Sequence, residues 1–263
     1  MYKHRKTFWK THGFTCIFGL FLLLMLKLYY SQTDSDGLLW LLAPTAFWIR
    51  TLSGISWEYL PHVGYVNHSF QFVIAASCSG IQFGIVTAAS LLFSFLPRIR
   101  GRKEGLVWLG ISFAASYMFT ILVNGFRILL SLYLPLYLQD LGKSQHLNGW
   151  LTPERLHTII GIVAYFGSLM MLFLITEALF QEADHSFSPL ILKQNPLLAS
   201  NMRWLWPAFW YFTIVLGLPL LNRAYQRNRQ PFTEYALTVL SVCLPILLLF
   251  AIVSKALTRG KRS

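Results

Sequence analysis

The chain has 263 residues, of which 55% are apolar or aromatic and only 12% are charged, and its mean hydropathy is +0.52. A soluble domain carries roughly a quarter charged residues, so this composition excludes a disordered chain, a coiled coil, a secreted disulfide scaffold and an ordinary cytosolic enzyme. The net charge of +12 comes from basic clusters between apolar runs, which indicates membrane orientation rather than nucleic-acid binding. The expected fold is all-α, a polytopic transmembrane helical bundle.

The first predicted element is a transmembrane helix over residues 14–30. A basic segment, residues 1–12, precedes it, and the chain then continues as Ser-Gln-Thr-Asp-Ser-Asp-Gly without the small-residue cleavage site of a signal peptide. Because basic segments beside a first span stay in the cytoplasm, we expect a retained helix with a cytoplasmic N-terminus.

Residues 38–60 are predicted to hold an interfacial or re-entrant segment. The apolar run 38–49 is too short to span a bilayer and contains Pro44. Residues 53–68 have the composition of a loop, with short strands as an alternative.

Five further apolar runs predict six spans in all, and six to eight if residues 38–60 hide a pair of half-helices. The runs cover residues 70–96, 106–127, 157–179, 204–221 and 235–253. The apolar sequence that begins with the run 106–127 continues too far for one span, so Gly125 or Pro135 is expected to break it. We expect residues 1–263 to form a single integral-membrane domain, in which residues 204–253 are a C-terminal extension of two spans.

Alternating the six spans from a cytoplasmic N-terminus places both termini in the cytoplasm. Most Lys and Arg residues then fall on the cytoplasmic side, including the basic loop 98–103, as the positive-inside rule requires. The loop 222–230 is the exception, because Arg223, Arg227 and Arg229 lie on the predicted outer side. Either this loop has a function or the last two spans are miscounted.

Three polar residues near span ends, Cys78, Arg127 and His157, are candidates for function, because ionisable groups are costly in a membrane. The predicted orientation places all three at the outer membrane boundary. Together they suit catalysis by a thiol nucleophile, Cys78. The imidazole of His157 can act as general base and acid, and the guanidinium of Arg127 is a fixed charge for an oxyanion or a substrate carboxylate. Asn124, three residues before Arg127 on the same helix face, could orient it.

The surroundings of Cys78 leave two helix starts open. Ser77 could cap a helix that begins here, while Ser79 and Gly80 allow another chain to approach closely. The helix N-terminus would then favour the thiolate. A helix that begins near Phe70 would instead place Cys78 about 12 Å along it, and a neighbouring residue would have to activate the thiol.

Each candidate also has a structural interpretation. Cys78 could be a small packing residue, as Cys16 and Cys243 are expected to be. Arg127 could be an interfacial anchor, and His157 could simply stand at a helix start.

The sequence predicts no cofactor and no metal. It has no P-loop, GxGxxG or HExxH motif, its three cysteines lack metal-ligand spacing, and Ser53-Gly54 lacks the first glycine of a serine elbow. A metal site made by outer-side histidines with Glu58 or Asp140 remains the alternative, and those histidines are His62, His68 and His146.

In order and context, the candidate residues resemble the exosortase/archaeosortase family of polytopic membrane transpeptidases over residues 70–180. The motifs that carry the resemblance are a Cys-Ser-Gly triplet that opens a span, an Asn-x-x-Arg that ends the next, and a His with a Gly four residues later that begins a third: Cys78-Ser79-Gly80, Asn124-x-x-Arg127 and His157 with Gly161.

The resemblance implies a cysteine peptidase or transpeptidase that cleaves C-terminal, PEP-CTERM-like sorting signals of surface proteins. Such a signal has a short motif such as Pro-Glu-Pro, an apolar helix and a basic end. Cys78 would attack the peptide carbonyl to form a thioester, His157 would protonate the leaving amine, and Arg127 would stabilise the oxyanion. An amine or water would release the product, and the signal's apolar helix would pack beside spans 70–96 and 157–179.

The resemblance also implies a place in the inner, or cytoplasmic, membrane, with the active site facing outward. Bacterial members are often associated with exopolysaccharide gene clusters. The expected partners are the sorting-signal helix and membrane lipid, with no nucleic acid. The C-terminal extension and the polar loop 181–203 leave the subfamily open.

Two other functions stay open. One is a small polytopic transporter or exopolysaccharide-export-associated subunit, in which Arg127 and His157 bind an anion and Cys78 only packs. The other is a scaffold without chemistry.

Overall fold

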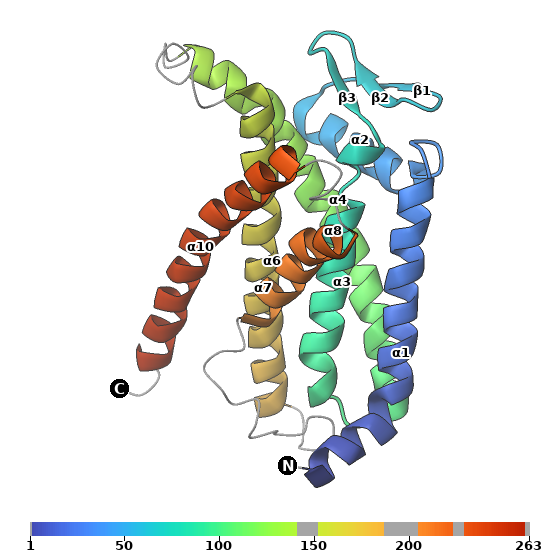
Figure 1. The fold of residues 1–263 in the computed structure, drawn as a ribbon, viewed down its shortest axis with the longest axis vertical. Coiled ribbons are helices and arrows are strands. Elements are labelled where there is room, and N and C mark those ends of the chain that lie inside the picture. Colours follow the sequence, from blue (N-terminus) through green and yellow to red (C-terminus); the bar gives the residue numbers. More distant parts are fainter. Residues whose placement is uncertain (1, 141–151, 187–204, 223–228, 261–263) are drawn as a thin grey trace. The chain divides into compact units, whose positions relative to one another are not determined.

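The computed structural model describes residues 2–140, 152–186, 205–222 and 229–260. The described chain is mostly helical, and five of its helices are long and apolar enough to cross a membrane (Figure 1). Five such helices indicate a multi-pass membrane protein. They are α1 (Tyr2–Gln32), α3 (Ile81–Phe95), which 3-10 turns extend to Ala76–Arg98, α4 (Arg102–Asp140), α6 (Pro153–Ser186) and α10 (Arg229–Gly260).

The predicted span 204–221 is a shorter apolar helix, Leu205–Leu221. A π-helical turn interrupts it, and such turns are rare insertions in α-helices. Its parts are α7 (Leu205–Phe212), the π turn (Thr213–Gly217) and α8 (Leu218–Leu221). The predicted loops on either side of it, 181–203 and 222–230, lie largely outside the described residues.

The predicted break at Gly125 or Pro135 is wrong, because α4 continues through both residues. Gly125 has a packing reason instead: a Cβ added there would collide with the indole of Trp48. Pro135 removes one helical hydrogen bond, but membrane helices tolerate this because neighbouring groups can satisfy the freed carbonyl. Helix breakers are therefore poor boundary signals in this chain.

The predicted start of a span at residue 70 is also wrong. Residues in this stretch form β3 (Phe72–Ile74), which pairs antiparallel with β2 (Gly64–Asn67), and β2 pairs antiparallel with β1 (Glu58–Leu60). The short strands expected as an alternative within residues 53–68 are confirmed. A short apolar run fits a strand and a buried helix equally well, and here the pairing with β2 decides.

All of the run 38–49 except its first residue lies within a helix, α2 (Leu39–Ser53), which includes Pro44. Its length of about 22 Å, at 1.5 Å per residue, is below the roughly 30 Å of a bilayer's hydrocarbon core. Gly54 ends it with a φ of 70°, which favours glycine. An interfacial or re-entrant position for α2 stays a prediction.

The chain forms two compact units. Unit 1 comprises residues 1–26, 85–116 and 166–263, and unit 2 comprises residues 27–84 and 117–165. Unit 2 holds α2, the three-stranded sheet and every candidate site residue. The site is therefore built within one unit.

Unit 1 contains a mostly buried ion pair surrounded by aromatic rings. The Nη2 atom of Arg98 donates to Oε2 of Glu177 over 2.6 Å, and the two side chains are only 12% and 18% exposed. The guanidinium carbon lies 5.3 Å from the ring centre of Phe95 and 5.6 Å from that of Phe180. This pair satisfies two charges that would otherwise be costly among apolar side chains.

We predict that Glu177→Gln lowers the free energy of unfolding by about 2 kcal/mol, because Arg98 is left without its counter-charge. Unfolding in mixed detergent micelles would measure this loss. The double variant Arg98→Gln with Glu177→Gln should cost less than the sum of the single variants, since the two charges are then removed together. Additive losses would show that the two charges do not depend on each other.

Candidate functional site

Cys78 ends a 3-10 turn between β3 and α3. Its N–H donates to the carbonyl of Ala75 over 2.8 Å, and its side chain is half-buried. Of the two predicted helix starts, the structure has the one beside Cys78 and not the one near Phe70. The expected cap is wrong in detail: Ser77 is exposed and makes no capping bond, whereas Oγ of the buried Ser79 accepts from the N–H of Ile81 over 3.4 Å.

Gly80 is required at the start of α3 for two reasons. Its φ of 75° lies in the left-handed region. A Cβ on it would also lie 3.0–3.2 Å from side-chain atoms of Asn124 and Thr120 on α4. The absence of a side chain therefore lets the Cys78 turn approach α4 closely.

Asn124 joins the Cys78 turn to the other candidates. This fully buried side chain donates from Nδ2 to the carbonyl of Cys78 over 2.7 Å. Its Oδ1 accepts from Nη1 of Arg127 over 3.2 Å and from the hydroxyl of Tyr165 over 2.7 Å. The predicted orienting role of Asn124 thus has a geometric basis, and Asn124 also holds the backbone of the Cys78 turn.

Arg127 contacts the other two candidates. It is 6% exposed, its Nη2 lies 2.7 Å from Nε2 of His157, and its guanidinium is close enough to the Cys78 side chain to interact electrostatically. Since a guanidinium only donates, Nε2 of His157 must accept, so the imidazole is neutral with its proton on Nδ1. Within the described residues Cys78 and His157 share no hydrogen bond, and Arg127 interacts with both, by a close contact with His157 and electrostatically with Cys78.

Tyr165 completes this cluster and was missed by the sequence analysis. Its hydroxyl accepts from Nη1 of Arg127 over 2.9 Å, and its ring stacks on Phe83 with centres 4.6 Å apart. Tyr165 and Gly161 follow His157 at intervals of four residues, which places them along one face of α6. A Cβ on Gly161 would lie 3.4 Å from Nε of Arg127, so this face of α6 packs against Arg127. The four-residue spacing of His157, Gly161 and Tyr165 was therefore the feature of the sequence that could have identified Tyr165.

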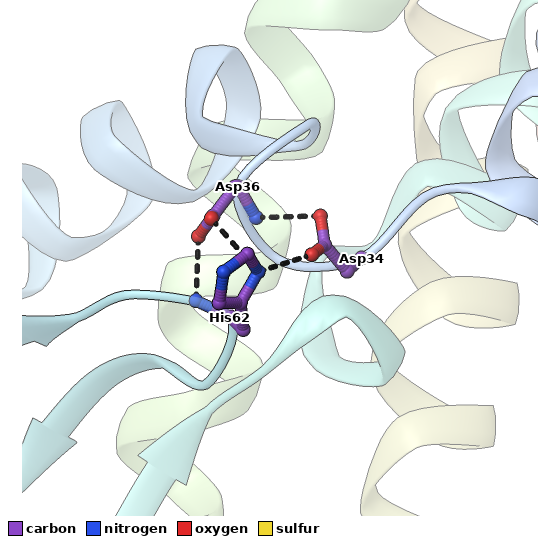
Figure 2. A group of neighbouring side chains, drawn as sticks. All are labelled: Asp34, Asp36 and His62. Atoms are coloured by element: carbon purple, nitrogen blue, oxygen red, sulfur yellow. Dashed lines mark hydrogen bonds and ion pairs between the residues drawn. The ribbon is translucent and has the colours of Figure 1, made fainter.

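A second cluster, outside the predicted spans, consists of Asp34, Asp36 and His62, and we call it the clasp (Figure 2). Nδ1 of His62 lies 2.7 Å from Oδ2 of Asp34 and 3.1 Å from Oδ2 of Asp36, and the N–H of His62 donates to Oδ1 of Asp36 over 2.7 Å. The clasp thereby ties the β1–β2 turn to the loop between α1 and α2.

Of the described residues, the clasp is the group with metal-ligand atoms within 4.8 Å of one another. It differs from the metal site predicted as an alternative, because His62 pairs with aspartates and not with Glu58. His68 pairs instead with Glu58, over 3.3 Å, while His146 lies outside the described residues. Protein donors already occupy the clasp carboxylates, so the clasp is explained as an internal tie.

Hydrogen bonding shifts the pKa of every member of the clasp. The His62 hydrogen bond lowers the pKa of Asp34, and the Tyr59 hydroxyl, which donates to Asp36, lowers the pKa of Asp36. The same bond raises the pKa of Tyr59 to about 12, and the bond to Asp34 raises the pKa of His62.

Ser35 connects the clasp loop to the Cys78 turn. Its buried Oγ donates to the carbonyl of Val63 over 2.9 Å and accepts from the N–H of Ala76 over 3.0 Å. The turn that carries Cys78 is thus held at Ala76 by Ser35 and at Cys78 by Asn124.

Comparisons of the chain with protein-family models, with curated proteins and with solved structures find no match. The assignment of a function therefore depends on the residues and contacts described above.

We predict that Tyr165→Phe slows alkylation of Cys78 by iodoacetamide about threefold to tenfold at neutral pH, because the guanidinium that interacts electrostatically with the Cys78 side chain loses one of its anchors. The rate would be measured by mass spectrometry in a chain with Cys16→Ala and Cys243→Ala. Phe83→Leu, which keeps the hydroxyl, is the matched control. An unchanged rate in Tyr165→Phe would show that the hydroxyl does not position Arg127.

The clasp should hold the β1–β2 turn best at mildly acidic pH. The raised pKa of His62 means that this residue stabilises the clasp fully below the ordinary imidazole pKa of 6.5. The stabilisation is lost as the pH rises through the raised pKa. The lowered pKa values of Asp34 and Asp36 mean that the stabilising contribution of these carboxylates is complete above their ordinary pKa of 3.8. It is lost as the pH falls through the lowered values.

Hydrogen exchange of a peptide covering residues 58–66, corrected for intrinsic rates, should therefore be slower at pH 5.5 than at pH 8. His62→Gln should abolish the difference, whereas His68→Gln should retain it. Equal protection of the wild-type chain at both pH values would contradict the proposed tie.

Proposed function

We propose that the chain is a membrane cysteine transpeptidase of the exosortase/archaeosortase type, which cleaves PEP-CTERM-like C-terminal sorting signals of surface proteins. The observation that supports this most directly is that Arg127 contacts a neutral His157 and interacts electrostatically with the Cys78 side chain. A nucleophile, a base and a fixed positive charge are the groups that acyl transfer through a thioester needs.

The first half of the proposed reaction forms the thioester. Sγ of Cys78 bonds to the scissile carbonyl carbon, and the thiol proton passes to Nε2 of His157. The carbonyl oxygen becomes an oxyanion, which draws the Arg127 guanidinium away from His157 and frees Nε2 for that proton. When the oxyanion collapses, the C–N bond breaks and His157 delivers its proton to the leaving amine.

The second half releases the product. The amine of an acceptor, or water, attacks the thioester carbonyl and gives up a proton to His157. The C–S bond then breaks, and the proton returns to the sulfur of Cys78. The products are a new amide or a carboxylic acid, and the reaction uses no cofactor.

An apolar cavity in unit 1 supports the expectation that an apolar helix of the signal packs beside the spans. Its volume is about 770 Å³, and Leu91 of α3, Val107 of α4 and Ile175 of α6 contribute to its lining. Val107 and Ile175 are 61% and 48% exposed, so in a bilayer they would contact lipid or another apolar helix.

The proposed location is the inner membrane, with both termini in the cytoplasm and Cys78 at the outer boundary. This orientation requires Leu205–Leu221 to cross the bilayer along with the five longer helices. An impermeant thiol reagent added to whole cells should then label Cys78 and not Cys16.

The proposal is tested by mass spectrometry of the C-termini of surface proteins, from cells that express the chain or its variants at equal abundance. Cys78→Ala should abolish processing, while His157→Ala and Arg127→Lys should each lower it at least about 100-fold. Cys243→Ala, which removes a buried thiol from α10, is the control and should process normally.

The same variants distinguish the alternatives. A transporter would tolerate Cys78→Ala but lose activity in the Arg127 and His157 variants. A scaffold would tolerate all three, and normal processing by Cys78→Ala would overturn the peptidase proposal.

A further inference from the structure

The strand β3 has an open edge. The order of the sheet is β1-β2-β3, and β3 pairs only with β2, through Asn67↔Phe72, Val66↔Val73 and Tyr65↔Ile74. Across the described residues, the backbone of β3 makes no hydrogen bond outside that pairing. An edge of this kind presents N–H and C=O groups that can pair with another extended chain.

This edge leads directly to the proposed nucleophile. Ile74 ends β3 four residues before Cys78, and the connection is held at Ala76 by Ser35 and at Cys78 by Asn124. A chain paired with β3 and running in the same direction would therefore arrive at the Cys78 turn.

The strand also lies beside the proposed general base. The ring centre of Phe72 is 6.3 Å from that of His157. Val73, the next residue, is 37% exposed, while Ile74 is fully buried. Because side chains alternate along a strand, a chain added to β3 would have one face toward the Val73 side of the sheet and the other toward the side of Phe72 and Ile74.

We propose that the open edge of β3 binds the substrate polypeptide as an added strand, using the residues that precede the scissile bond. This inference rests on the proposed function. The apolar helix of the proposed substrate follows the cleavage point, so the residues before that point stay outside the membrane. In the proposed orientation the sheet, which precedes the candidate span Ala76–Arg98, lies on the same side. The added strand is parallel to β3, and its backbone supplies the affinity.

The test uses probes that offer only a peptide backbone, acetyl-alanyl chloromethyl ketones of one and of four residues. The sulfur of Cys78 displaces chloride to form a thioether, and the thiol proton is lost to a base. With purified full-length protein carrying Cys16→Ala and Cys243→Ala, we expect the four-residue probe to modify Cys78 at least tenfold faster than the one-residue probe.

Three further probes ask whether strand pairing causes this advantage. Only alternate residues of an added strand turn their amides to its neighbour, so N-methylation of one inner alanine should remove the advantage and N-methylation of the other should leave it. A four-residue probe with a benzophenone at an inner position, irradiated after attachment to Cys78, should crosslink to residues 72–74.

The outcomes separate the two proposals. If both probes modify Cys78 at equal rates, if neither N-methyl group matters, or if crosslinks fall only on α2 or α6, the inference about β3 is overturned while the peptidase proposal stands. If no probe modifies Cys78 faster than it modifies an unfolded control of the same chain, the peptidase proposal itself fails, and the inference about β3 with it.

Discussion

The buried guanidinium of Arg127 is the constraint on which the site depends. It is 94% removed from solvent, yet within the described residues its partners are a carbonyl oxygen, a phenolic hydroxyl, an imidazole and a thiol, and no carboxylate pairs with it. A buried cation without a counter-charge is costly. The cost falls if an anion forms nearby, and the oxyanion of the proposed thioester chemistry would be such an anion.

The segments between the long helices contribute as much to this site as the helices do. The thiol lies on a turn outside α3, and a helix alone would not fix the position of that turn. Two hydrogen bonds from distant residues hold it, one from Ser35 in the loop after α1 and one from Asn124 within α4. The clasp in turn fixes the loop that carries Ser35. A surface tie, a buried serine and the nucleophile thus form one connected chain of contacts.

The sequence predicts the long apolar helices well, because length and composition alone define them. It predicts that Cys78, Arg127 and His157 lie on one side of the membrane, and in the structure Arg127 lies 2.7 Å from His157 and interacts electrostatically with Cys78. Tyr165 was not predictable by residue type, since a tyrosine in an apolar helix is normally an interfacial residue. The strand β3 was misassigned because its apolar residues fit a helix equally well, and only pairing with β2 identifies it.

The informative residues of such a chain are few for a physical reason. A lipid-facing position needs only to be apolar, so the exposed sides of α1 and α10 accept many residues. A buried polar residue is constrained by each of its partners: Asn124 must meet a backbone carbonyl, a guanidinium and a hydroxyl at once. Gly80 and Gly161 are constrained by the space that these groups need. Short, separated motifs can therefore carry a functional signal when the apolar sequence between them carries none.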